Sequence, residues 1–333
     1  MSFPVQADLL QRLALLVQRH WNLDCTSVEP IKVRENAVFA AHLQGGGKVV
    51  LRVHRCGYHS DAALHSERTW MQALSDHGVE VPRHVLTNSG QSFEKILIEG
   101  FDGERQVDVF HWIAGQQLGS VEQGFTASAG SVGDVYRDVG KLAARVHNHS
   151  ASWTAPEGFK RHAWDADGLA GENPFWGRFW ELEALSDSQR ELFVHLKQTL
   201  YRELRQFGTG SDRYGLIHAD LVPENVLVDA GRLQVIDFDD AGFGWHLFEL
   251  ATSLYFIRRD AIYEDARDGL IDGYRQIRAL PDAHLALLPL FLAARGTTYL
   301  GWVHTRRGEP VAQELTPQLI EMAMLAAEDY LGG

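Results

Sequence analysis

One stretch of the sequence is more informative about the fold than any other: Leu216-Ile217-His218-Ala219-Asp220-Leu221-Val222-Pro223-Glu224-Asn225-Val226-Leu227-Val228-Asp229, then the turn Ala230-Gly231, then Leu233-Gln234-Val235-Ile236-Asp237-Phe238-Asp239-Asp240. Two four-residue apolar runs flank the turn, which predicts a short β-hairpin. In such a hairpin, Asn225 at the head of the first strand lies opposite the end of the second, beside Asp237.

The hairpin would bring together an amide oxygen and a carboxylate, which are oxygen ligands that suit Mg²⁺. Asn225 and Asp237 are therefore candidate metal ligands. Asp239 is a further candidate if it faces the site, although Asp239 and Asp240 could equally be solvated. Asp220 precedes Asn225 in the loop, close enough to orient an attacking hydroxyl and accept its proton. Phosphoryl transfer depends on this combination of positioning and charge neutralisation.

The pattern His-x-Asp-x-x-x-x-Asn at 218–225, followed by Ile-Asp-Phe-Asp at 236–239, resembles the catalytic loop and metal-binding motif of the protein-kinase-like superfamily. It is most similar to the branch of aminoglycoside phosphotransferases, choline kinases and type II homoserine kinases. The resemblance implies a two-lobed fold and the cofactors ATP and Mg²⁺. It also implies that Asp220 is the catalytic base beside His218, with Asn225 and Asp237 as magnesium ligands.

Each of these residues also has a purely structural interpretation. Asp220 and Asn225 could be turn residues that bond their own backbone, and Asp237 could cap a following helix. His218 could organise the loop by hydrogen bonding instead of transferring protons. The combined motif favours the catalytic interpretation for the three acidic and amide residues.

From Val28 to about Trp112 the pattern is mostly that of β-strands with one inserted helix. Residues 37–43 and 48–55 are apolar runs separated by three glycines, which predicts a hairpin. Between residues 58 and 77, apolar side chains recur at three- and four-residue steps, and Glu67 falls among them. A carboxylate facing inward needs a partner, and Arg52, on the neighbouring strand, is the candidate.

The resemblance also implies that several residues of this region bind the nucleotide. Arg52 stands where kinases of this type carry a lysine that contacts the ATP phosphates, and Glu67 is its expected partner. The turn Glu35-Asn36-Ala37-Val38-Phe39 replaces a glycine-rich phosphate loop, so Asn36 is a candidate there, although a polar hairpin tip has the same residues. Phe110 and Trp112 fall at the expected inter-lobe hinge, where the backbone would contact adenine.

After Gly115 the chain reads as largely helical, with the short β stretch of residues 214–237 inside it. We therefore predict an α+β fold: a nucleotide-binding lobe, residues 1–112, with a small antiparallel sheet and one helix, and a larger helical lobe, residues 113–333. Residues 115–130, rich in Gly, Gln and Ser, are the predicted linker.

The composition narrows the range of partners. Lys and Arg total 31 against 44 Asp and Glu, and the net charge of −13 argues against nucleic acid or anionic membrane as a partner. The two cysteines match neither a disulfide framework nor a metal site, and no secretory signal is visible, so a cytoplasmic location is expected. Nothing in the sequence indicates the oligomeric state.

The leading hypothesis is transfer of the ATP γ-phosphate to a hydroxyl of a small metabolite: an amino alcohol, a hydroxy amino acid such as homoserine, or a sugar. An arginine in the acceptor pocket would favour a carboxylated substrate, and acidic residues alone an amine. Two alternatives remain: a bacterial Ser/Thr protein kinase of the stress-response type, and a non-catalytic nucleotide-binding regulator. Either acceptor-lining or packing roles fit six residues: Trp176, Arg178, Trp180, Arg295, Tyr299 and Trp302.

Overall fold

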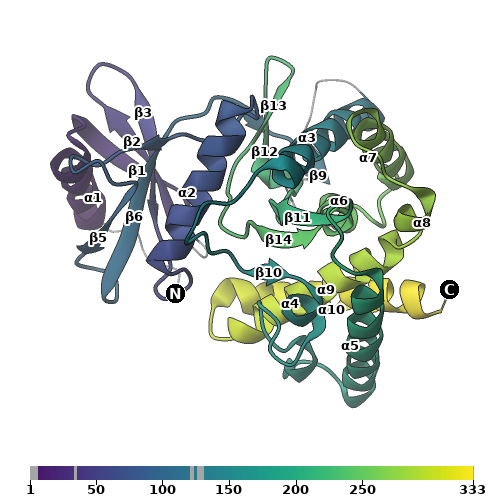
Figure 1. Cartoon of the computed structure of the whole chain (residues 1–333). Helices are drawn as coiled ribbons and strands as arrows, with labels where there is room; N and C mark the ends of the chain where they lie inside the picture. The colour runs from purple at the N-terminus through teal and green to yellow at the C-terminus, as the bar shows by residue number, and fades with distance from the viewer. Residues whose placement is uncertain (1–6, 34–35, 121–123, 126–130, 333) are drawn as a thin grey trace. The chain divides into compact units, whose positions relative to one another are not determined.

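The computed structural model describes residues 7–33, 36–120, 124–125 and 131–332, and Figure 1 shows their elements. The chain divides into two compact units. The first comprises Met1–Ala114 and Ala155–Lys160, and the second comprises Gly115–Thr154 and Arg161–Gly333. The first unit is built on an antiparallel sheet and the second is mostly helical, so the predicted α+β class is confirmed.

The first unit contains one sheet with the strand order β1-β2-β3-β6-β4, and β5 also pairs with β6. Every pairing in it is antiparallel. The strands are β1 (Cys25–Val33), β2 (Ala37–Leu43), β3 (Lys48–Val53), β4 (His84–Val85), β5 (Phe93–Leu97) and β6 (Glu104–His111). The predicted hairpin is β2 and β3, in register from Ala37 opposite Val53 to His42 opposite Lys48.

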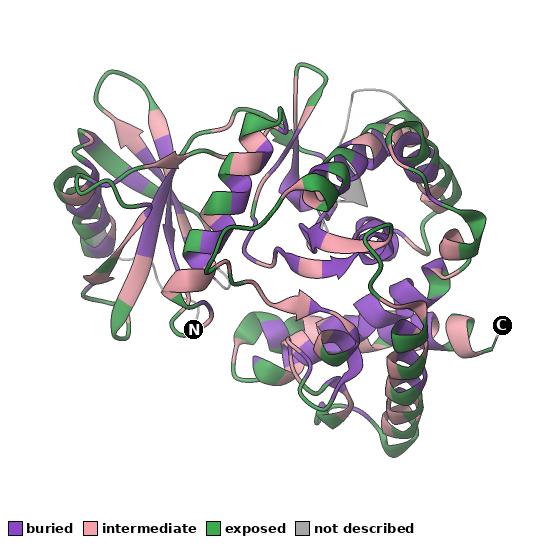
Figure 2. Ribbon diagram, viewed as in Figure 1, coloured by how far each residue is buried: buried purple, intermediate pink, exposed green. Residues whose placement is uncertain are grey.

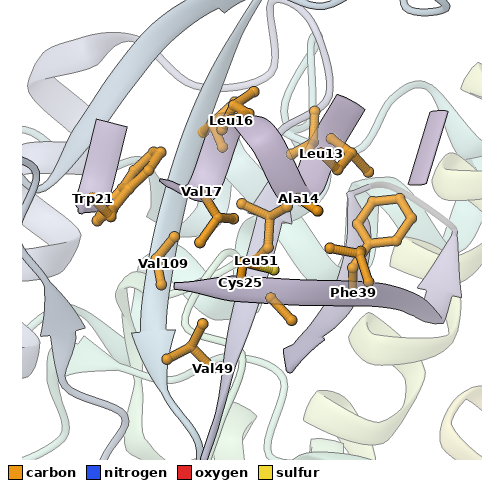
Figure 3. Packing of buried hydrophobic residues seen from close by; sticks show 14 of the residues in the cluster. Leu13, Ala14, Leu16, Val17, Trp21, Cys25, Phe39, Val49, Leu51 and Val109 are labelled. Atoms are coloured by element: carbon orange, nitrogen blue, oxygen red, sulfur yellow. The ribbon is translucent and has the colours of Figure 1, made fainter. Parts of the chain in front are cut away.

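Helix α1 (Ala7–Trp21) packs on this sheet, and its amphipathic pattern explains why. Figure 3 shows Leu13 and Val17 of the helix beside Phe39, Leu51 and Val109 of the strands, and all five are almost completely buried. The first unit therefore contains α1 in addition to the helix inserted between its strands.

That expected helix is α2 (Asp61–Asp76). It begins three residues later than the apolar pattern suggested, because the Ser60 hydroxyl accepts a hydrogen bond from the Ala63 N–H and caps the helix. Its buried face includes Leu64, Trp70 and, among these apolar neighbours, Glu67. The predicted inward position of this carboxylate is thus confirmed.

Two helices of the second unit, α6 (His246–Tyr255) and α9 (Leu288–Thr305), are buried on most sides. Every residue of α6 is buried, and α6 is drawn in purple in Figure 2. The apolar run near residue 290 lies in α9, which is also mostly buried, and no helix in the described part of the chain is long and apolar enough to cross a membrane. The helices are α3 (Val132–Ser152), α4 (Ala166–Ala170), α5 (Asp187–Phe207), α6 (His246–Tyr255), α7 (Tyr263–Ile277), α8 (Asp282–Leu285), α9 (Leu288–Thr305) and α10 (Pro310–Leu331), with 3₁₀ turns η1 (Phe179–Glu181) and η2 (Pro223–Asn225).

Helices α3 and α7 approach closely enough to require glycine. A Cβ atom placed on Gly140 would lie 2.1 Å from the Leu270 carbonyl oxygen, and one on Gly273 would lie 1.8 Å from that of Arg137. Both distances are far inside van der Waals contact. The pair therefore packs backbone against backbone, and α3 also contacts the short strand of residues 214–217.

The short strands form three small sheets in the second unit, ordered β13-β12-β7, β10-β14-β11 and β8-β9. Their bounds are β7 (Gln116–Gln117), β8 (Gly119–Ser120), β9 (Gly124–Phe125), β10 (Ala163–Trp164), β11 (Tyr214–Ile217), β12 (Val226–Asp229), β13 (Arg232–Val235) and β14 (Gly242–Trp245).

The predicted linker of residues 115–130 is only partly correct. Residues 121–123 and 126–130 lie outside the described residues, but β7 pairs with β12, and the Leu118 N–H donates to the Val226 carbonyl. At Gly115, with a φ of +147°, a Cβ would lie 3.1 Å from both Leu227 and the Val228 carbonyl. The glycine that looked like a flexible joint therefore permits the chain to pack against the hairpin.

Candidate active site

The hairpin that the sequence predicted is present, formed by β12 and β13. Asp229 pairs with Arg232, and both turn residues, Ala230 and Gly231, have positive φ, as a two-residue type I′ turn requires. At its other end the Ile236 N–H donates to the Asn225 carbonyl at 2.9 Å. The backbone of Asn225 is therefore hydrogen-bonded to that of Ile236, the residue immediately before Asp237.

Asp220 lies in the loop between β11 and η2, with its side chain 23% exposed. Both carboxylate oxygens are engaged: Oδ1 accepts from Arg295 Nη2 at 2.7 Å, and Oδ2 accepts from Asn225 Nδ2 at 2.7 Å. The carboxylate is thus fixed in orientation but still reachable from solvent. This is the arrangement that a group acting on a bound hydroxyl needs.

The same contact orients the Asn225 amide. A carboxylate only accepts hydrogen bonds, so the amide nitrogen must face Asp220, where it also donates to the Asp220 carbonyl at 2.9 Å. The amide oxygen is then directed away from Asp220. It is the atom of Asn225 that a hard cation such as Mg²⁺ would bind.

Within the described residues, no group of three or more His, Cys, Asp or Glu side chains could hold a metal ion by itself. Mg²⁺ is usually bound by one or two carboxylates together with phosphates and water, so a pair such as Asn225 and Asp237 fits that ion. Asp239 is buried, and Arg161 donates to the carbonyls of Phe238, Asp239 and Ala241. Arg161 thereby fixes the backbone on both sides of the two acidic residues that follow Phe238.

His218 is buried, and both of its ring nitrogens contact the backbone. Nε2 lies 3.0 Å from the Ile236 carbonyl and donates to it, while Nδ1 accepts from the Asp220 N–H at 3.3 Å. One imidazole therefore links the catalytic loop to the second strand of the hairpin. This geometry suits an organising role better than proton transfer.

Glu249 of α6 holds the same loop from the other side. Its carboxylate is completely buried and accepts from the N–H groups of His218 at 3.0 Å and Ala219 at 2.6 Å. Ala219 has a φ of +65°, which costs a non-glycine residue about 1 kcal/mol or more, so the hydrogen bonds maintain a strained conformation.

A buried chain of polar groups continues behind Glu249. His147 Nε2 lies 3.5 Å from the Glu249 carboxylate, and its Nδ1 lies 2.9 Å from the Tyr274 hydroxyl, which donates to it. Burial lowers the pKa of His147, which keeps the ring neutral. Burial would raise the pKa of Glu249, but its hydrogen bonds hold the pKa below the ordinary value, and Glu249 stays charged.

In the first unit, Arg52 is the centre of a buried charged cluster. Its Nη2 donates to Glu67 at 2.8 Å and to Asp108 Oδ2 at 2.7 Å, and its Nε donates to Asp108 Oδ1 at 3.0 Å. The ion pair with Glu67, inferred from the helical period, is present. The bidentate pair with Asp108 on β6 is the stronger contact.

Sequence reasoning missed Asp108, although a signal was available. Asp108 stands between Val107 and Val109 in an apolar strand, and an inward carboxylate there needs a cation. His54 Nε2 also contacts Asp108 Oδ2 at 3.1 Å. Burial would raise the pKa of Asp108, but Arg52 and His54 hold it well below its usual range.

The other residues predicted to bind the nucleotide have mixed surroundings. The Asn36 side chain accepts from the Arg55 N–H at 3.0 Å and so stabilises the hairpin end, while Glu35 lies outside the described residues. Phe110 is buried with Arg52 over its ring at 4.8 Å. Trp112 is exposed, and the Lys48 ammonium lies 3.6 Å above its ring.

Three of the six proposed acceptor-lining residues gather beside Asp220. Arg295 contacts Asp220 directly, and its guanidinium lies over the rings of Trp176 at 5.1 Å and Tyr299 at 4.4 Å. Three others have different neighbours: Arg178 pairs with Glu181, Trp180 lies under Lys197, and Trp302 lies under Arg306.

Comparisons with known proteins show the family and the fold of the chain. The sequence model of a family described as "Phosphotransferase enzyme family" matches residues 27–284. The solved structure of a microcompartment-associated aminopropanol kinase is 31% identical, covering 96% of this chain and 97% of that one, with a TM-score of 0.82. An amicoumacin kinase in complex with AMP-PNP, Ca²⁺ and Ami superposes with a TM-score of 0.77 at 22% identity, covering 96% of this chain and 93% of that one. The homoserine kinase of Gluconacetobacter diazotrophicus is 28% identical over 255 residues, which are 73% of this chain and 72% of that protein. The kinase-like fold expected from the motif is thereby confirmed.

Proposed function

Because the chain belongs to the phosphotransferase enzyme family, we propose that it transfers the γ-phosphate of ATP, with Mg²⁺, to the hydroxyl of a small amino alcohol. The observation that carries the proposal is the carboxylate of Asp220, fixed on both oxygens by Arg295 and Asn225 yet partly exposed. A loose phosphoryl-transfer transition state demands this kind of positioning.

In this proposal each residue of the loop has a separate task. Asp220 orients the acceptor hydroxyl and accepts its proton as the oxygen attacks phosphorus. Asn225 and Asp237, with Asp239 as a further candidate, would hold Mg²⁺, whose charge offsets that of the phosphates. His218 and Glu249 keep the loop in its strained conformation.

In the first unit, Arg52 is the proposed phosphate contact and Glu67 the group that positions it. The bidentate pair with Asp108 supports a fixed guanidinium, which suits planar phosphate recognition. Asn36, Phe110 and Trp112 are retained as proposed nucleotide contacts, with the backbone near Trp112 facing the adenine.

Two observations support an amine in the acceptor over a carboxylate. Arg295 is completely buried and already bonded to Asp220, so a substrate carboxylate could pair with it only by displacing Asp220. Asp240 is also near enough for its charge to act on Arg295. The two carboxylates, Asp220 and Asp240, carry more negative charge than Arg295 alone can offset, so the surroundings favour an ammonium group in the acceptor. The similarity to an aminopropanol kinase over 96% of the chain agrees with this charge pattern.

An ADP-release assay against a matched acceptor panel tests the proposal. The panel contains 1-amino-2-propanol, ethanolamine, choline, homoserine, a sugar, an aminoglycoside and 1,2-propanediol, in which a hydroxyl replaces the amine of the first compound. We expect kcat/KM for aminopropanol to exceed that for propanediol by about 100-fold, because a site built around a charged group rejects the analogue that lacks it. Preference for homoserine would overturn the acceptor, and no Mg²⁺-dependent transfer to any alcohol would overturn the reaction.

A further inference from the structure

Arg295 is unusual among the arginines of the second unit because its side chain has no exposed surface and lies next to a candidate catalytic group. It comes from α9, 75 residues after Asp220 and beyond residues 27–284, which the family model matches. No other carboxylate among the described residues pairs with it. Arg295 is therefore placed by the C-terminal helices, outside the residues that the family model matches.

The contacts of Arg295 converge on two adjacent loop residues. Nη2 donates to Asp220 Oδ1 at 2.7 Å, and Nη1 donates to the Ala219 carbonyl at 3.2 Å. Nη2 also donates to the Tyr299 hydroxyl at 2.8 Å. The guanidinium thus holds both the catalytic carboxylate and the strained residue that precedes it.

The surroundings keep the guanidinium in place and charged. The rings of Trp176, Phe248 and Tyr299 lie 5.1, 5.7 and 4.4 Å from its central carbon, which favours a cation. Burial would lower the pKa of Arg295, but Tyr299 and Asp220 raise it. Within the described ranges its Nε has no hydrogen-bond partner, which costs free energy for a buried N–H group. The side chain is therefore held by the contacts of Nη1 and Nη2.

Resting on the proposed function, we propose that Arg295 is a positioning residue for phosphate transfer: it fixes the rotamer of Asp220 so that the carboxylate meets the acceptor hydroxyl, without touching substrate itself. Glu249 accepts hydrogen bonds from backbone N–H groups of the loop, whereas Arg295 binds the side chain of Asp220, the residue that reacts. Without Arg295, the Asp220 carboxylate would keep only the hydrogen bond that it accepts from Asn225. Misplacement of a reacting group by about 1 Å reduces rates by about 100-fold.

A double-mutant cycle distinguishes this role from a structural one. Arg295→Lys keeps the charge but loses the two-pronged contact, and Arg295→Met removes both. In the otherwise native enzyme we expect kcat to fall about 10- to 100-fold for the lysine variant and further for methionine, with the KM for ATP nearly unchanged. In an Asp220→Asn background, measured by transfer of radiolabelled γ-phosphate over long incubations, Arg295→Lys should change kcat by less than about twofold.

Arg258→Lys is the matched control, because the Arg258 side chain is only 8% exposed and pairs with a carboxylate, Asp329, while its hydrogen bonds and ion pairs within the described residues do not reach the catalytic loop. Its kcat should stay at the native value. If Arg295→Met does not fold, as judged by circular dichroism, the lysine variant carries the test.

Equal losses from Arg295→Lys in both backgrounds would show a structural role and overturn the inference, as would full activity in the native background. Native enzyme that phosphorylates no alcohol would instead overturn the proposed function. The two failures are therefore distinguishable.

Discussion

Arg52 in the first unit and Arg295 in the second are both buried among aromatic and acidic groups, but they differ in how exposed their partner carboxylates are. Arg52 pairs with Glu67 and Asp108, both almost completely buried, whereas Arg295 pairs with Asp220, which remains 23% exposed. The side chains of Arg52, Glu67 and Asp108 are all shielded from solvent, and they form a rigid charged cluster. The ion pair of Arg295 leaves one partner able to react. Similar chemistry therefore holds a proposed phosphate contact in place in the first unit and orients a proposed reacting group in the second.

The largest expected difference in stability comes from removing the two cations. Arg52→Met leaves two buried carboxylates without their cation and should lower the free energy of unfolding by about 3–5 kcal/mol. Arg295→Met should lower it by less, because water can reach Asp220. Urea unfolding followed by circular dichroism measures both. A smaller loss for Arg52→Met than for Arg295→Met would contradict the comparison.

A smaller effect is expected from acid. The pKa of Asp108 lies below its unfolded value near 3.8, so the unfolded chain binds more protons there and stability falls with decreasing pH. The contribution is complete above about pH 5 and is lost as the pH falls through the folded pKa. Asp108→Asn, although less stable at neutral pH, should lose stability less steeply between about pH 5 and 3.

Unfolding free energies measured at a series of pH values test this slope. The exposed Asp282→Asn variant is the control and should keep the native slope. Because Glu249 is also a buried, charged carboxylate, the slope of Asp108→Asn should be reduced without vanishing. An unchanged slope in that variant would contradict the account of the Asp108 cluster.

Local patterns predicted much of this molecule. The hairpin of β12 and β13 followed from a two-residue turn between apolar runs, and the inward position of Glu67 followed from the helical period, while its pairing with Arg52 also rested on the resemblance to kinases. Both depend on residues whose geometry is set by a few neighbours in sequence.

The errors and omissions involve contacts between distant segments. The glycine-rich segment after residue 114 looked like a linker because its pairing with β12, more than 100 residues away, has no local signal. For Arg295 both acceptor lining and packing were open, and the structure buries it against Asp220. Its partner could not be inferred from spacing, since α9 must first pack in the second unit.

The catalytic assignment of Asp220 is the central claim, and comparing Asp220→Asn with native enzyme tests it most directly. The asparagine keeps the shape of the side chain, and its one amide oxygen can still accept from either Arg295 or Asn225, but it cannot accept the hydroxyl proton. We predict that kcat with the best acceptor falls about 100- to 10,000-fold, while the dissociation constant for Mg²⁺-ATP, measured by calorimetry, stays within about twofold. Asp229→Asn, at the turn of the same hairpin, should retain native turnover. Comparable turnover in Asp220→Asn and native enzyme would contradict the account.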